Sequence, residues 1–168
     1  MDKMAANTIR IAAALIDDAE DRLLLVRKAG SSWFMQAGGK IEAGETPLCA
    51  LRRELGEEIG VPLASENARY LGCFTAAAAN EPGHLVEAEI FHVRLDRIPE
   101  IRAEIEEAIW VDHSQATKMP LAPLTRDHIL PLSISLKSLR RDDLPYSLGP
   151  SPLSIASVET PISRDGAG

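Results

Sequence analysis

The chain has 168 residues, of which 45% are hydrophobic and 4% aromatic. This composition is typical of a single folded domain with its own core. Acidic residues outnumber basic ones by 25 to 18, giving a formal net charge of −7. That balance argues against a nucleic-acid surface, which needs a basic stripe, and it means that a polyphosphate could approach only where cations reverse the local field.

No apolar run is long enough to span a bilayer, and residues 1–10 lack an apolar signal core. We therefore expect no membrane contact, and a cytoplasmic protein. Cys49 and Cys73 are spaced too widely for a metal-ligand motif, so both are expected to be reduced and partly buried thiols.

The first part of the chain predicts a β-hairpin. Residues 8–16 are β-branched and apolar, an acidic turn follows, and residues 23–26 are again apolar. Arg27 and Lys28 leave this second strand next to a glycine-rich segment, where they either face phosphates or are solvated. Residues 33–36 predict a short strand that leads into the glycines.

Gly38, Gly39 and Gly44 predict a loop in which the backbone approaches a ligand closely. Gly38 and Lys40 are therefore candidates for substrate binding. A helix is expected to follow, because Thr46 suits its N-cap, Pro47 its first position and Gly60 the position just beyond its end.

This helix has two distinct faces. Its apolar residues fall in one narrow stripe that must face the core: Leu48, Leu51, Leu55 and Ile59. Three carboxylates, those of Glu54, Glu57 and Glu58, gather on another face and would repel one another there. Either water screens them, or they hold a hard cation, for which carboxylate oxygen is the proper ligand.

Two more strands are expected after the helix. Residues 70–79 are strand-like and end in an alanine run, and residues 80–83 predict a loop. Residues 85–95 predict the clearest strand, with successive side chains on opposite faces. In the second of these strands Glu87 and Glu89 share a face with Phe91 and Val93, so they lie at the rim of the sheet or near a site.

The remaining segments predict a short strand at residues 108–112 and a second helix from residue 124 or 125 to 139 that covers the other face of the sheet. Residues 145–168 are rich in proline, serine and glycine and lack periodicity, so they are expected to form a mobile tail. The predicted domain therefore spans residues 1–144.

The segment from Gly39 to Val61 resembles the Nudix box, G-x5-E-x7-R-E-U-x-E-E-x-G-U with U an aliphatic residue. Every fixed position is matched: Gly39, Glu45, Arg53, Glu54, Leu55, Glu57, Glu58, Gly60 and Val61. At average residue usage such a match arises by chance with a probability on the order of 10⁻⁷ or less. The box covers about a seventh of the chain. One departure is Ala37, which stands where Nudix sequences commonly carry proline.

The resemblance implies an α/β fold, specifically an α/β/α sandwich with a mixed sheet. It also implies metal-dependent hydrolysis of a pyrophosphate bond in a nucleoside diphosphate linked to another group, X. The metal would be Mg²⁺ or Mn²⁺, held by the Gly39 carbonyl and by Glu54, Glu57 and Glu58. The family includes many homodimers, so a homodimer is possible.

Some roles stay open within this resemblance. The general base is expected to be Glu57 or Glu54, and a carboxylate from outside the box is expected at Glu107 or, second, Glu104. Arg53 is expected to pair with Glu57 across one helical turn and so orient a metal ligand, and Glu45 is expected to tie the loop to the helix by a similar charge-assisted hydrogen bond. The alanine run after the box offers no hydrogen-bonding side chain, which weakly favours a nucleoside triphosphate, including an oxidised one, as substrate.

Two rival functions follow from the same residues. One is a nucleotide-sensing module that keeps the fold without turnover, although such modules usually lose box carboxylates. The other is an isomerase of a prenyl diphosphate, which would pair its acid with a catalytic cysteine, a role that neither Cys49 nor Cys73 indicates.

Overall fold

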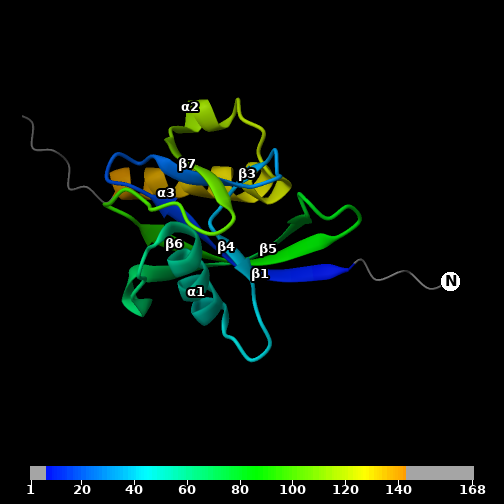
Figure 1. Ribbon diagram of the computed structural model, residues 1–168. Coiled ribbons are helices and arrows are strands. Elements are labelled where there is room, and N and C mark those ends of the chain that lie inside the picture. The colour runs from blue at the N-terminus through cyan, green and yellow to red at the C-terminus, as the bar shows by residue number, and fades with distance from the viewer. Residues whose placement is uncertain (1–6, 143–168) are drawn as a thin grey trace, which may run out of the picture.

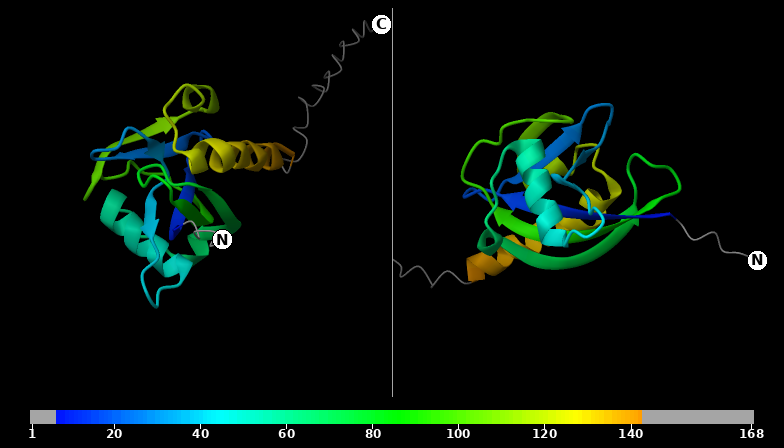
Figure 2. Two further views of the ribbon diagram at one scale, coloured as in Figure 1. Left: turned by 90° about the vertical axis from the view of Figure 1, so that its right-hand side faces the viewer. Right: turned by 60° about the horizontal axis from the view of Figure 1, so that its bottom comes forward.

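The computed structural model describes residues 7–142. This part of the chain forms a seven-stranded mixed sheet with helices on both sides, as Figures 1 and 2 show. The strands are β1 (Thr8–Asp17), β2 (Leu23–Lys28), β3 (Phe34–Met35), β4 (Gly38–Lys40), β5 (Ala68–Ala77), β6 (Leu85–Arg94) and β7 (Ile105–Val111). The helical segments are α1 (Pro47–Ile59), η1 (Ser65–Asn67), α2 (His113–Ala116), η2 (Thr125–Ile129) and α3 (Leu130–Asp142).

The sheet is mixed because β1 runs parallel to β6 and antiparallel to β2 and β4. Strand β2 pairs with β1 only at its start, where Asp17 lies opposite Leu23, and then diverges to pair with β7. The edge of β1 that β2 leaves free is taken by β4, with Ala13 opposite Gly38 and Ala12 opposite Gly39. The glycines are thereby fixed against the central strand.

Most predicted elements are confirmed. The hairpin, the strands near residues 70–79 and 85–95 and the helix between Thr46 and Gly60 all form. The prediction of a loop at Gly38 and Gly39 is wrong, because both residues belong to strand β4. Their pairing with β1 supplies the backbone hydrogen-bond partners that a free loop would lack.

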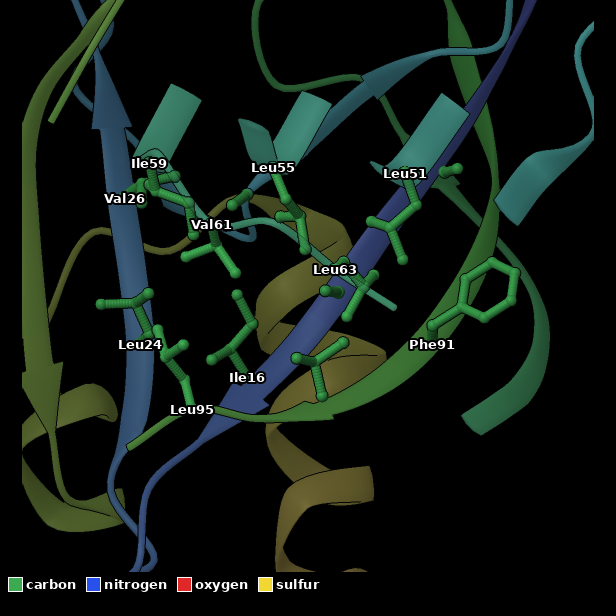
Figure 3. Packing of buried hydrophobic residues seen from close by; sticks show 14 of the residues in the cluster. Ile16, Leu24, Val26, Leu51, Leu55, Ile59, Val61, Leu63, Phe91 and Leu95 are labelled. Atoms are coloured by element: carbon green, nitrogen blue, oxygen red, sulfur yellow. The ribbon is translucent and has the colours of Figure 1, made fainter. Parts of the chain in front are cut away.

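Two hydrophobic cores lie on opposite sides of the sheet. The core beneath α1 is drawn in Figure 3, where Leu51, Leu55 and Ile59 from the helix meet Ile16 and Leu24 from β1 and β2. The second core lies beneath α3. It contains alternate residues of the same strands, such as Leu15 and Leu25, because successive side chains in a strand point to opposite faces.

The C-terminal helix covers the second face, as the sequence predicted, but its start is irregular. The π-helical segment η2 runs directly into α3, and Pro131 follows it within a continuous helical run, where its missing N–H interrupts the regular i→i−4 ladder. Leu136 is buried, whereas Leu139 is 58% exposed and so is not part of the predicted apolar stripe. The short helix α2, capped by Asp112, was not predicted. The expectation that Cys49 and Cys73 are partly buried is wrong, because both are exposed.

Residues 145–168, for which a tail was predicted, lie outside the described part of the chain. Among residues 7–142, none of the helices has the length and apolar character needed to cross a membrane.

Candidate active site

Helix α1 presents the box carboxylates because both of its ends are fixed. The Thr46 side chain accepts a hydrogen bond from the Cys49 amide at 3.2 Å, and Gly60 ends the helix in a left-handed conformation with φ +65°. With Leu51, Leu55 and Ile59 completely buried, the rotation of the helix about its axis is set. The carboxylate face must then point toward β4 and the end of β2.

Glu58 is the buried member of the three carboxylates, with a side chain only 5% exposed. Its Oε1 lies 3.0 Å from Lys28 Nζ, and its Oε2 accepts a hydrogen bond from the Gly38 amide at 3.0 Å. Burial raises the pKa of Glu58, while the Lys28 ammonium and the Gly38 N–H act in the opposite direction. Glu58 thus ties the helix to both β2 and β4.

Glu54 lies directly against the glycine pair. A side-chain carbon placed on Gly39 would fall onto the Glu54 carboxylate, so only glycine lets this carboxylate lie against the backbone of β4. Arg53 Nη1 donates to Glu54 Oε1 at 2.8 Å, and the same nitrogen is 3.5 Å from Glu57 Oε2. Glu57 is the solvent-facing member, with its side chain 56% exposed.

Arg53 joins the loop before the helix to the carboxylates. It donates to both oxygens of Glu45, at 2.8 and 3.0 Å, and to the Lys40 carbonyl at 3.0 Å. These bonds lower the pKa of Glu45 to about 2 and raise that of Arg53, the Glu45 hydrogen bond being the largest cause for Arg53. Glu45 therefore ties the loop to the helix as predicted, whereas the short hydrogen bond of Arg53 within the box goes to Glu54 and not to the predicted Glu57.

We expect Arg53→Lys to lower kcat about tenfold or more, because an ammonium cannot reproduce the planar fork that spans Glu45 and Glu54. Steady-state kinetics measure this effect. Arg52→Lys is the matched control, since Arg52 neighbours it on α1 but donates to the Leu63 carbonyl instead. Equal activity of the two variants would show that the fork is dispensable.

A cavity of about 820 Å³ opens beside these groups. Its lining includes all three box carboxylates together with Lys28, Lys40 and Arg53. It also includes small and apolar side chains of β1, β5 and β6, such as Ile11, Ala77 and Val86. A ligand with both an anionic part and a less polar part would match this mixed lining.

The predicted site residues separate into two groups. Gly38, Gly39, Lys28 and Lys40 line the cavity along with the box residues Arg53, Glu54, Glu57 and Glu58. Arg27 and Glu107 do not line it. They face each other across β2 and β7, with Arg27 Nη2 3.2 Å from Glu107 Oε2, and Arg27 also pairs with Glu106 at 3.2 Å. Glu104, the second choice, does line the cavity.

Glu87 and Glu89 have a third fate. They pair with Arg10 at 3.5 and 3.9 Å, and Glu89 accepts a hydrogen bond from the Tyr70 hydroxyl. Neither lines the cavity, and β6 lies between β1 and β5, so these carboxylates form ion pairs on the face of an inner strand and not at the rim of the sheet.

The sequence does not predict six polar residues of the cavity wall: Ser31, Gln36, Glu42, Asn80, Glu81 and Thr125. Four of them form two hydrogen-bonded pairs. Ser31 Oγ donates to Asn80 Oδ1 at 3.0 Å, and Thr125 Oγ1 donates to Gln36 Oε1 at 2.9 Å. Each pair joins residues far apart in sequence, so no local pattern could have predicted it. The alanine run does reach the cavity, and the residue that follows it, Asn80, supplies the hydrogen-bonding side chain.

The donor set suits a hard divalent cation, because carboxylate oxygens and a backbone carbonyl are the ligands that Mg²⁺ and Mn²⁺ prefer. Gly39 lets its backbone lie against the Glu54 carboxylate, and a bulkier residue would fill that space. Among residues 7–142, no three acidic, histidine or cysteine side chains are gathered around one point. Lys28 and Arg53 supply the neutralising charge instead.

A mixed sheet between two helical layers, with a carboxylate-bearing helix at the edge of a cavity, defines the Nudix type of α/β/α sandwich. The NUDIX domain model matches residues 7–132, and the chain belongs to that family.

Three curated proteins show the range of relatives. A CTP pyrophosphohydrolase of Escherichia coli is 31% identical over 124 residues, covering 68% of this chain and 84% of that protein. An 8-oxo-dGTP diphosphatase of Haemophilus influenzae is 42% identical over 62 residues, 34% of this chain. An octanoyltransferase of Myxococcus xanthus is 36% identical over 110 residues, 62% of this chain. The matches span only 46% and 30% of the last two proteins.

Solved structures show the same fold. The solution structure of the E. coli ORF135 protein superposes with a TM-score of 0.61 at 25% identity, covering 86% of this chain and 99% of that one. The predicted α/β/α sandwich with a mixed sheet is therefore confirmed.

Proposed function

We propose that the protein hydrolyses a pyrophosphate bond of a nucleoside diphosphate linked to a group X, with a nucleoside triphosphate as the foremost substrate. One observation carries this proposal: three cations and three carboxylates line the same cavity. They are Lys28, Lys40 and Arg53, and Glu54, Glu57 and Glu58. The names of the E. coli and H. influenzae relatives, a pyrophosphohydrolase and a diphosphatase, support the same reaction class.

Gly39, Glu54, Glu57 and Glu58 would hold Mg²⁺ or Mn²⁺. When bound, such an ion supplies charge neutralisation at the phosphoryl oxygens and lowers the pKa of a water molecule. Arg53 orients the Glu54 carboxylate through the 2.8 Å hydrogen bond, and Glu45 holds Arg53 in turn. Glu58, fixed by Lys28 and the Gly38 amide, keeps the helix and the glycine strand in register.

Lys28 and Lys40 are placed to attract the phosphate chain. An acidic chain repels a polyphosphate overall, so these cations in the cavity wall lower the barrier to its approach. Glu57 is the foremost general base because its side chain is the most exposed of the three and is free to accept a proton from water. Of the two candidates for the carboxylate from outside the box, we now favour Glu104, because Glu104 lines the cavity and Glu107 does not.

The test is a substrate panel in the presence of Mg²⁺ or Mn²⁺. Nucleoside triphosphates, oxidised nucleotides, ADP-ribose, NADH and dinucleoside polyphosphates are assayed for release of pyrophosphate or, with added alkaline phosphatase, for phosphate freed from the monoester products. We expect turnover of at least one nucleotide, and we expect EDTA to abolish it and added Mg²⁺ to restore it. Tight nucleotide binding without turnover would instead favour the sensing module, and turnover that persists in EDTA would exclude the metal-dependent reaction.

We further propose a cytoplasmic protein with a small-molecule partner, whose catalytic domain spans residues 1–144. The homodimer stays a proposal that sedimentation velocity would test.

A further inference from the structure

The cavity wall contains two side-chain amides in matching environments. At Gln36 the carbonyl oxygen accepts a hydrogen bond from Thr125 Oγ1 at 2.9 Å, and at Asn80 it accepts one from Ser31 Oγ at 3.0 Å. All four residues line the cavity. In both pairs a hydroxyl occupies the acceptor side of the amide, which leaves the NH₂ group to face other partners.

Neither NH₂ group has a protein acceptor among the described residues. Gln36 is only 4% exposed, and its Nε2 is a buried nitrogen without a hydrogen-bond partner in that part of the chain. Buried polar groups are nearly always paired, so an orphan donor in a cavity wall indicates an acceptor supplied by the ligand. Asn80 differs in being solvent-exposed, at the rim of the cavity, and its Nδ2 makes no hydrogen bond within residues 7–142.

The two amides reach the cavity from different directions. Gln36 lies between β3 and β4, directly before the glycine strand, whereas Asn80 lies on the loop between β5 and β6. The 3.0 Å bond to Ser31 fixes that loop to the loop between β2 and β3. The donors are therefore part of a bridged wall rather than of a free loop.

We infer that this wall selects substrates whose ring presents carbonyl oxygens, that is, keto nucleobases, over those whose ring presents amino groups. The inference rests on the proposed function and adds the chemical class of the base to it. Two amide donors match ring carbonyls, whereas an exocyclic amino group would place donor against donor, and this mismatch costs most at the buried Gln36. Glu81, next to Asn80, also lines the cavity, and its carboxylate suits the ring N–H beside such a carbonyl.

Two substrate pairs isolate this feature. UTP and CTP differ at one ring position as carbonyl against amino group, and ITP and ATP differ in the same way on a purine. We expect kcat/KM to favour the keto member of each pair about tenfold or more, the discrimination that one mismatched hydrogen bond provides. The ratio within a pair is the informative quantity, because a general loss of folded protein lowers both members equally.

Variants assign the ratio to the amides. Asn80→Asp replaces the donor with an acceptor at an exposed position, and Gln36→Met removes the buried donor with little change in volume. Both are expected to reduce the keto preference about threefold or more, with the larger effect for Gln36 because it is desolvated. Ser31→Ala tests positioning: it is expected to lower the ratio in the native chain but not in the Asn80→Ala background. Asn67→Asp, exposed on η1, is the matched control.

The outcomes separate the two proposals. Turnover of nucleotides with equal kcat/KM within both pairs, or a keto preference that survives both amide substitutions, would overturn this inference while the hydrolase proposal stands. Turnover of no nucleotide at all would overturn the proposed function and this inference with it. If Gln36→Met fails to fold, as a thermal melt would show, the exposed Asn80→Asp variant still decides.

Discussion

Glu57→Gln is expected to lower kcat about a hundredfold or more while leaving the free energy of unfolding within about 0.5 kcal/mol of the native value. The amide keeps the shape of the side chain and removes its ability to take up a proton. Stability is expected to hold because the Glu57 side chain is 56% exposed and its nearest cation, Arg53 Nη1, is 3.5 Å away.

Single-turnover kinetics at saturating metal and urea unfolding measure the two quantities. Glu66→Gln, at an exposed position on η1, is the control and should match the native protein. Restoration of kcat by high Mg²⁺ would show that Glu57 acts as a metal ligand alone, and near-native kcat in the folded variant would remove it from the reaction. Glu54→Gln run in parallel tests the other candidate for the base.

Alanine at Gly38 and at Gly39 is expected to fail in two different ways. A side chain at Gly38, where φ is +148°, would overlap the Ala12 carbonyl oxygen and come within 2.6 Å of Ala13 Cα. These are backbone atoms of β1 and cannot move aside, so Gly38→Ala should lower the free energy of unfolding by about 3 kcal/mol or more. At Gly39 the collision is with the Glu54 carboxylate, which is the end of a flexible side chain.

Gly39→Ala should therefore stay within about 1 kcal/mol of native stability and lose activity tenfold or more, because Glu54 is displaced. Thermal or urea unfolding and kcat are measured together for both variants. Gly56→Ala is the control, since a side chain there meets nothing within 4 Å and α1 gains helix propensity. If Gly39→Ala kept full activity, the close approach of Glu54 to β4 would have no part in catalysis.

Residues close together in sequence were predicted well. The limits of α1 follow from Thr46, Pro47 and Gly60, whose effects are local, and its buried stripe follows from the helical period. The same holds for β6, in which Phe91 joins the core beneath α1 and Ile90 the core beneath α3. The Nudix box lies within these local elements, and so the family could be recognised before the fold was known.

Contacts between distant residues were predicted poorly. The sequence predicts that Arg27 and Glu107 both belong to the site. In the structure β2 pairs with β7, so the two side chains form an ion pair in which Arg27 Nη2 is 3.2 Å from Glu107 Oε2. Conversely, Glu104 reaches the cavity from the segment just before β7. Whether Glu104 or Glu107 reaches the cavity depends on the residue at which β7 begins to pair with β2. The composition of the acidic segment around them does not indicate that residue.

The sequence by itself determined the family, the order of elements and the three carboxylates on one helical face, since each depends on spacing of a few residues along the chain. Only the tertiary structure decided how those carboxylates differ: Glu58 is buried against Lys28 and the Gly38 amide, whereas Glu57 faces solvent. It likewise paired Ser31 with Asn80 and Thr125 with Gln36. The physical reason is that burial and hydrogen bonding depend on which strands lie side by side, and that is a property of the whole folded chain.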